Sequence, residues 1–438
     1  MNSISKEKRL HPHKILLLFF LLVYVGNVFY HLLKVENFFY ADLRNRVVGA
    51  RLMARDTSPY YFKWQPATSE TLIDPFDRPA IKNNMITSPP SVLWLMQPLA
   101  NLTYSQITFA WIVIQQICFL IILLSLFYFF KSNRARTGIA ISGVLLLLSD
   151  QWWASIYKGQ SHFFLPAILG VCILLSVWKS SYHFFAIGFL LALMVWIRPV
   201  ALLIVPFIFC CRHMNRKFLL GGFAGGSIFL IILTFALHQE NYWIDFANSC
   251  KDWLDYFESG KKAGRFFSAE TLEGKKLVAK GSLLIRWKSE VSNLFPLLAN
   301  STGIRISQTV ITTSWAVLYL TALLVWFKTT VKGLADAIMA GLFFYWLFEI
   351  TGTIPKMSYY YVELFVIVYF LAGKFSVLSK SNKLVFLISL ICLFLDFIPL
   401  NLTLSEILLI VSLCQYLLQK YLKNEKAPFN KGAALFKN

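Results

Sequence analysis

Long apolar stretches alternate with short polar segments along almost the whole chain. The hydrocarbon core of a bilayer, about 30 Å thick, requires roughly 20 helical residues, and fewer where neighbouring helices shelter a shorter one. On this measure the pattern predicts twelve membrane-spanning helices, of which the third, fifth and sixth are short. Their expected limits are about 15–33, 106–130, 137–149, 162–178, 183–197, 199–211, 218–237, 308–327, 333–350, 359–373, 383–399 and 404–421.

The composition also favours a membrane protein. Of the 438 residues, 57% are hydrophobic and only 15% are charged, whereas an ordinary soluble domain is about 45–50% apolar and about 25% charged. These values argue against a soluble enzyme or a disordered protein. Six of the seven cysteines lie in or beside apolar segments, without the spacing of a disulfide framework or a zinc site. We therefore expect one all-α polytopic membrane domain over residues 1–438.

The distribution of basic residues predicts the orientation. The net charge of +20 need not indicate nucleic acid, because basic residues beside apolar helices hold cytoplasmic loops against an anionic leaflet. Both termini are then cytoplasmic, and the two long loops, 34–105 and 238–307, are extracytoplasmic. The first apolar segment follows a basic N-terminus and has no small-residue cleavage site, which favours a membrane helix over a removable signal peptide. With the lysine-rich tail, this favours a bacterial inner (plasma) membrane.

The first long loop contains the densest charged pattern. A rotation of 100° per residue sorts residues 41–55 into three helix faces. One face is apolar (Leu43, Val47, Ala50, Ala54), one is cationic (Arg44, Arg51, Arg55), and one carries Asp42, Arg46, Gly49 and Met53. An apolar stripe beside a cationic stripe is typical of a helix in the membrane interface. Asp42 and Arg46 are either a helix cap with a surface ion pair or part of a functional site.

Further polar residues lie at the expected outer ends of apolar helices. Lys158, Gln160 and His162 lie at the outer mouth of the fourth predicted span, and Arg198 lies between two short ones. An arginine at that depth is costly unless it is paired or faces a wet cavity, so it is a candidate functional residue. For Gln160 and His162, interfacial hydrogen bonding is an equally open alternative. In the second long loop, aromatic residues either stack on sugar rings or anchor an interfacial helix; they are Tyr242, Trp243, Trp253 and Tyr256.

Taken in order, these segments resemble glycosyltransferase family 87, the polyprenyl-phosphate-sugar-dependent membrane enzymes of the GT-C superfamily. The resemblance covers roughly the first 210 residues and lies at 41–44, 49–52, 58–60, 87–90, 97–100, 158–160 and 196–199. It implies a GT-C type bundle with its active site on the outer face, and transfer of a sugar, often mannose or a pentose, to an acceptor hydroxyl. The acidic residue of the family's first loop matches Asp42. Arg44 and Arg46 stand where the family usually has aromatic residues.

The residue types suit such a transfer. A phosphate leaving group needs stabilising cations more than an acid, and the acceptor hydroxyl needs a base. A single inverting displacement requires one essential carboxylate rather than a close pair. We therefore predict Asp42 as the base. The candidate contacts to phosphate or sugar are Arg44, Arg46, Lys158, Gln160, Arg198 and Lys356.

The expected partners are a polyprenyl-phosphate sugar, a lipid or glycan acceptor, and membrane lipids, with no nucleic acid. No paired acidic motif for a metal–diphosphate complex is present, so we expect neither metal nor cofactor. Glu349 is an isolated acidic residue for which pairing with a nearby lysine is the simpler interpretation. Two other functions stay open: a transporter or flippase of lipid-linked substrates, and a polymerase or ligase of lipid-linked glycans. The transporter predicts charges in the middle of several spans, whereas here the charges gather at outer ends.

Overall fold

The computed structural model is all-helical: the residues that it describes contain no β-strand. The described residues are 12–35, 41–63, 65, 67–68, 72, 86–178, 180–211, 215–259, 307–328, 333–352, 356, 358–395 and 401–425. In the first half of the chain the helices are α1 (Pro12–Leu33), α2 (Ala41–Met53), α3 (Pro90–Met96), η3 (Gln97–Leu99), α4 (Tyr104–Phe129), α5 (Asn133–Leu147), α6 (Asp150–Lys158), α7 (Phe164–Leu175), α8 (Ser181–Ile197), η4 (Pro199–Leu203) and α9 (Val205–Phe209). In the second half they are α10 (Arg216–Ala236), α11 (Glu240–Ser259), α15 (Gln308–Lys328), α16 (Leu334–Thr351), η6 (Ser358–Leu364), α17 (Phe365–Lys374), η7 (Phe375–Val377), α18 (Lys380–Cys392) and α19 (Asn401–Glu425), where η marks a 3-10 helix.

Within this part of the chain, seven helical segments are long and apolar enough to cross a membrane, so the chain is an integral membrane protein. They are α1, α4, α10, α15, α16, the segment from η6 to η7, and α19. An eighth span results if α5 and α6, which meet at a bend of 56°, are counted together. The other predicted spans coincide with α7, α8, η4 with α9, and α18, which are shorter helices. The total of twelve spans therefore stays a prediction.

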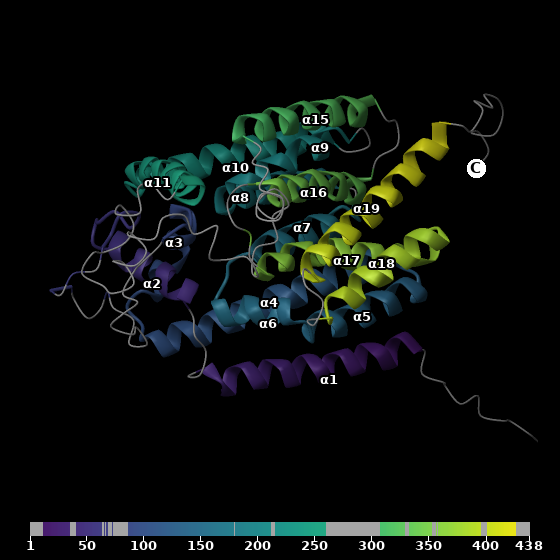
Figure 1. Cartoon of the computed structure of the whole chain (residues 1–438), viewed down its shortest axis with the longest axis horizontal. Coiled ribbons are helices and arrows are strands. Elements are labelled where there is room, and N and C mark those ends of the chain that lie inside the picture. The colour runs from purple at the N-terminus through teal and green to yellow at the C-terminus, as the bar shows by residue number, and fades with distance from the viewer. Residues whose placement is uncertain are drawn as a thin grey trace, which may run out of the picture.

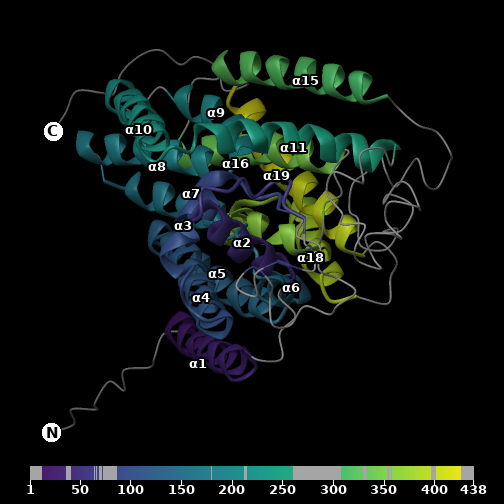
Figure 2. The ribbon, with the colours of Figure 1, turned by 90° about the vertical axis from the view of Figure 1, so that its left-hand side faces the viewer.

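Helices α2, α3 and α11, which belong to none of the predicted spans, gather at one end of the bundle. Figure 1 shows α2, α3 and α11 at the left-hand end, while α1, α15 and α16 run along the long axis of the molecule. The start of α1 and the end of α19 lie at the other end. Figure 2 looks onto the end that carries α2, which lies there with α3, α6 and α11 around it. Sequence segments about 200 residues apart thus meet at this end.

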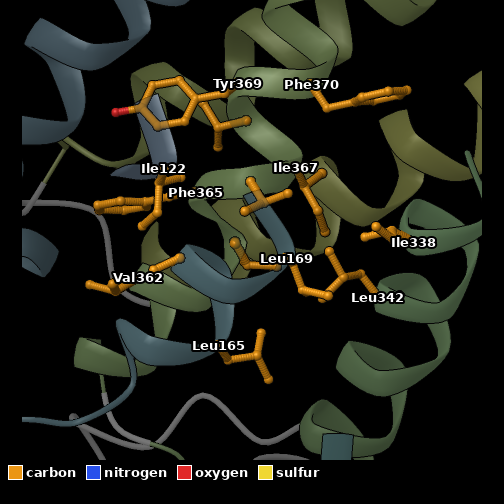
Figure 3. Packing of buried hydrophobic residues seen from close by; sticks show 14 of the residues in the cluster. Ile122, Leu165, Leu169, Ile338, Leu342, Val362, Phe365, Ile367, Tyr369 and Phe370 are labelled. Atoms are coloured by element: carbon orange, nitrogen blue, oxygen red, sulfur yellow. The ribbon is translucent and has the colours of Figure 1, made fainter. Parts of the chain in front are cut away.

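The centre of the core is α17, which is apolar on all sides. Every residue from 365 to 371 is at most 1% exposed, and a helix that is hydrophobic all round must be enclosed by others. Figure 3 shows Phe365 and Ile367 of this helix among Leu169 of α7 and Leu342 of α16. This packing fixes η6, which immediately precedes α17 and contributes to the site described below.

Helix α2 is buried against protein on most of its surface. Leu43 and Ala50, on the predicted apolar face, are fully buried. The predicted cationic face also contacts protein, because Arg44 is only 5% exposed and Arg51 donates from Nε to the carbonyl oxygen of Ala100 at 2.9 Å. The stripe pattern thus serves contacts with α3, η3 and α6, and an interfacial position for α2 stays a prediction.

Candidate functional site

A cavity of about 710 Å³ lies at the end of the bundle that carries α2 and α11. Its volume is in the usual range of ligand sites, about 300–1,000 Å³. Among the predicted site residues, those that line it are Asp42, Arg46, Gln160, Arg198 and Lys356. The fold therefore brings together five of the seven candidates, from four segments that are distant in the sequence.

The other two candidates do not line the cavity. Arg44 is buried on a different face of α2, and Lys158 is the last residue of α6. The charges of both residues still lower the pKa of Asp42. Their role as direct substrate contacts stays a prediction.

Gln160 bridges Asp42 and Arg46. Its Nε2 donates a hydrogen bond to Oδ2 of Asp42, and its Oε1 accepts one from Nη2 of Arg46 at 2.7 Å. The described residues contain no ion pair within 4 Å between Asp42 and Arg46 themselves, so the neutral amide takes the place of the surface pair that the sequence spacing suggested. Asp42 is half-buried, and its Oδ1 has no hydrogen bond to the described part of the chain. One carboxylate oxygen is thus held and the other is available.

Gly159 fixes the backbone that precedes this bridge. It ends α6 with a left-handed φ of 61°, and a Cβ atom there would lie 2.4 Å from Cβ of Leu43. Its carbonyl oxygen accepts hydrogen bonds from Arg46 at 2.9 Å and from the indole of Trp111 at 3.0 Å. A glycine is required both by the backbone conformation and by the close approach of α2 and α6.

The surroundings of Asp42 make it a stronger base than an exposed aspartate. Burial raises the pKa of Asp42, and this effect exceeds the opposing influence of Arg46, Lys158 and Arg44 and of the hydrogen bond from Gln160. A carboxylate with a raised pKa has a greater affinity for a proton. This is the direction that proton abstraction requires.

Arg198 belongs to a buried polar network. Its Nη2 donates to Oε1 of Glu349 at 3.1 Å, and its Nε donates to the hydroxyl of Tyr345 at 3.1 Å. The same Nε is 3.4 Å from Oε1 of Glu363, and the guanidinium carbon lies 5.3 Å from the centre of the Tyr360 ring. Glu349 thus forms an ion pair with Arg198, whereas the sequence suggested a nearby lysine.

Glu363 is the centre of this network. It is fully buried, and its Oε1 lies 2.6 Å from Nδ1 of His162, while its Oε2 accepts a hydrogen bond from the hydroxyl of Tyr345 at 2.5 Å. With Arg198, three partners surround one carboxylate. Sequence reasoning missed Glu363, although an isolated acidic residue in an apolar stretch is by itself a signal for function.

Lys356 is 1% exposed, and its ion-pair partner is a residue that does not line the cavity. Its Nζ donates to Oε2 of Glu406 at 2.7 Å and lies 3.5 Å from the centre of the Trp346 ring. Burial lowers the pKa of Lys356, and Glu406 opposes this shift. This ammonium group therefore faces the cavity with much of its charge already balanced.

The remaining wall of the cavity is apolar and aromatic. It comes from α11, α15 and α16 and contains Trp243, Phe246, Trp253, Leu254, Ile311, Trp315 and Phe348. Of the loop aromatics noted in the sequence, Trp243 and Trp253 line the cavity. Tyr242 packs against the buried cluster that contains Val48 and Tyr60, and the side chain of Tyr256 lies outside the described residues. The cavity therefore has a polar half and an apolar half.

Two hydrogen bonds join α11 to the loop after α2. Ser58 donates to Oδ2 of Asp245 at 2.5 Å, and the hydroxyl of Tyr61 donates to Oδ2 of Asp252 at 3.0 Å. The ring of Tyr60 also packs 5.5 Å from that of Phe246. The two long loops predicted from the sequence are thus in contact with each other.

The described residues contain no group of three or more His, Cys, Asp or Glu side chains placed to hold a metal ion. Metal independence stays a prediction. A scan against models of protein families finds no match to this chain, and a search of curated proteins finds none that is significantly similar.

Proposed function

We propose that this protein is an inverting glycosyltransferase that moves one sugar from a polyprenyl phosphate to a hydroxyl of a lipid or polysaccharide acceptor. The observation that carries the proposal is the state of Asp42: a half-buried carboxylate with a raised pKa, held at Oδ2 and available at Oδ1. It faces a cavity that is also lined by three cationic side chains, Arg46, Arg198 and Lys356. A base beside a cationic site for phosphate is what this reaction needs.

In the proposed reaction, Oδ1 of Asp42 takes the proton of the acceptor hydroxyl. The hydroxyl oxygen attacks the anomeric carbon, the bond from that carbon to the phosphate oxygen breaks, and the electron pair leaves with the phosphate. Arg46 and Arg198 stabilise the phosphate as its charge develops. A single displacement inverts the anomeric centre. Gln160 keeps both Asp42 and Arg46 in position.

The two halves of the cavity support a lipid-linked donor. The polar half would hold the sugar and the phosphate, and the aromatic wall of α11, α15 and α16 would contact the first isoprene units. A nucleotide-linked donor would have no use for an apolar wall that continues into membrane helices. Mannose or a pentose as the sugar rests on the resemblance to family 87. So do the GT-C arrangement of about twelve spans and an active site on the outer face of a bacterial inner membrane.

The test is transfer of radiolabelled mannose or pentose from polyprenyl phosphate by the protein in lipid nanodiscs, with a host glycolipid extract as acceptor. Replacing Asp42→Asn removes the base, and we expect transfer to fall by about 10²–10⁴-fold. Asp56→Asn is the matched control, because Asp56 is exposed after the end of α2 and has a positive φ that asparagine adopts readily. The control should transfer like the wild type.

The alternatives predict different results. If neither protein transfers sugar but both bind and move the lipid carrier across the bilayer, the chain is a transporter. If the wild type transfers only whole oligosaccharides from a diphosphate carrier, it is a polymerase or ligase. Equal transfer by the wild type and by Asp42→Asn would keep the enzyme and remove Asp42 as its base.

A further inference from the structure

His162 lines the cavity but has no part in the reaction described above. It lies in the turn between α6 and α7, two residues after Gln160, and is 7% exposed. Its Nδ1 is 2.6 Å from Oε1 of Glu363. A buried polar ring that borders a cavity and is held from behind by a carboxylate is an arrangement that orients the ring toward a ligand.

The second ring nitrogen of His162 is available to a ligand. Because Nδ1 lies against the Glu363 carboxylate, Nε2 is on the opposite side of the ring, and it has no hydrogen bond within the described residues. The ring itself is fixed, since its centre lies 4.0 Å from that of Tyr360 and 5.7 Å from that of Tyr359. The direction of Nε2 is therefore set by three neighbours.

The charge state of His162 determines what Nε2 can bind. Burial lowers the pKa of His162 to about 4, and the charge of Arg198 acts in the same direction against the opposing effect of Glu363. The ring is then neutral near pH 7. A neutral imidazole that donates from Nδ1 to a carboxylate presents a lone pair at Nε2. That nitrogen accepts a hydrogen bond from a hydroxyl and does not attract a phosphate.

Five of the charged groups that line the cavity have a different task. The cations Arg46, Arg198 and Lys356 only donate hydrogen bonds, and Asp42 is assigned to the proton. Glu363 already has three partners. A sugar brings several hydroxyl groups into the cavity, and those that donate need acceptors.

From these contacts we propose that His162 determines carbohydrate specificity by accepting, at Nε2, a hydrogen bond from one hydroxyl of a sugar bound in the cavity. The proposal rests on the proposed function only in that the ligand is a sugar. The hydroxyl belongs either to the transferred sugar or to the acceptor. Loss of that hydroxyl leaves a buried acceptor unpaired, which costs about 1–3 kcal/mol and corresponds to roughly 5–150-fold in affinity.

The experiment measures binding, so it does not depend on transfer. Protein in nanodiscs is titrated with citronellyl-phosphate mannose and its monodeoxy analogues in one arm, and with octyl mannoside and its monodeoxy analogues in the other. The readout is the change in tryptophan fluorescence on binding, because Trp243, Trp253 and Trp315 line the cavity. In the wild type we expect one deoxy analogue of one arm to bind about tenfold more weakly than its parent, within the range for an unpaired buried acceptor.

The variants are His162→Phe, which removes both nitrogens, and His162→Asn, whose amide still donates to Glu363 but has no group at the position of Nε2. In both, the sensitive deoxy analogue should bind as well as its parent. His183→Phe is the matched control, because His183 lies in α8, stacks on Trp178 and does not line the cavity. It should keep the wild-type pattern. If His162→Phe does not fold, His162→Asn alone decides the question.

The proposal is overturned if the wild type binds no glycoside, if no deoxy analogue binds more weakly than its parent, or if the same difference persists in His162→Asn. The arm that contains the sensitive analogue identifies the hydroxyl as that of the donor or of the acceptor. A wild type that shows the deoxy effect but transfers no sugar would refute the glycosyltransferase and leave the role of His162 intact. Sugar transfer by a wild type that shows no deoxy effect would support the glycosyltransferase and refute the role of His162.

Discussion

Two of the three carboxylates that line the cavity, Glu363 and Asp42, have opposite surroundings. Glu363 is fully buried, and its two oxygens are held by His162, Arg198 and Tyr345. Asp42 is half-buried, and Gln160 is its hydrogen-bond partner within the described residues. The number of hydrogen-bond donors around a carboxylate thus distinguishes a structural group such as Glu363 from a reactive group such as Asp42.

The largest expected effect is on stability and comes from Glu363. Replacing Glu363→Ala leaves the buried groups around it without their shared acceptor, and removing one partner from a buried charged network costs about 3–5 kcal/mol. Asp42→Ala is the control and removes a single hydrogen bond, worth about 1 kcal/mol. Chemical denaturation in mixed micelles measures both. Equal losses of unfolding free energy in the two variants would remove the distinction between the carboxylates.

The raised pKa of Asp42 predicts the direction in which ionisation of Asp42 changes the stability of the folded protein. A carboxyl whose pKa is higher in the folded than in the unfolded protein binds its proton more tightly when folded, so its ionised form lowers stability above that pKa. Asp42→Asn should therefore fold at least as stably as the wild type at pH 7 while losing transfer. This combination distinguishes a reactive group from a structural one.

A smaller effect is expected at Gly159, which positions the Asp42 side of the cavity. In Gly159→Ala the new Cβ meets Leu43 at 2.4 Å, and alanine is strained at a φ of 61°. We expect a loss of about 1–3 kcal/mol, together with slower transfer, because the backbone beside Gln160 must move. Gly26→Ala is the matched control, since a Cβ at Gly26 meets nothing within 4 Å in α1. If Gly159→Ala melts and transfers sugar like the wild type, the contact between α2 and α6 does not determine the position of Gln160 between Asp42 and Arg46.

The helices were the most predictable part of this protein. Apolar segments of about 20 residues have few alternatives in a membrane, so residues 106–130 and 218–237 correspond to α4 and α10 within a few residues. The bends and breaks between consecutive helices were harder to predict. The end of the 137–149 segment carries Ser149, which accepts a hydrogen bond from the backbone of Trp152 and starts α6 after a bend of 56°.

The residues of the candidate site could be predicted only where a local sequence pattern marks them. The spacing of Asp42 and Arg46 on one helix pointed to a site, and the depth of Arg198 marked it as functional. Their partners come from distant helices: Gln160 lies 118 residues after Asp42, and Glu363 lies 201 residues after His162. No local pattern specifies which distant groups meet, because tertiary packing decides it. For Glu363 the isolated charge in an apolar stretch was the one available signal.

The smallest expected effect concerns the pH dependence of transfer and Lys158. The base acts when ionised, so the rate falls as the pH drops through the pKa of Asp42, and burial places that fall at higher pH than for an ordinary aspartate. The charge of Lys158 lowers the pKa of Asp42. Lys158→Met should therefore move the acid limb of the rate profile to still higher pH, with a plateau rate within about twofold of the wild type, as expected for the loss of one partly screened charge. Lys158→Arg, which keeps the charge, should leave the limb in place. Two results would contradict this expectation: an acid limb that moves to lower pH in Lys158→Met, or a plateau rate that is lost while the limb stays in place. Either would mean that Lys158 contacts the substrate itself and does not control the pKa of Asp42.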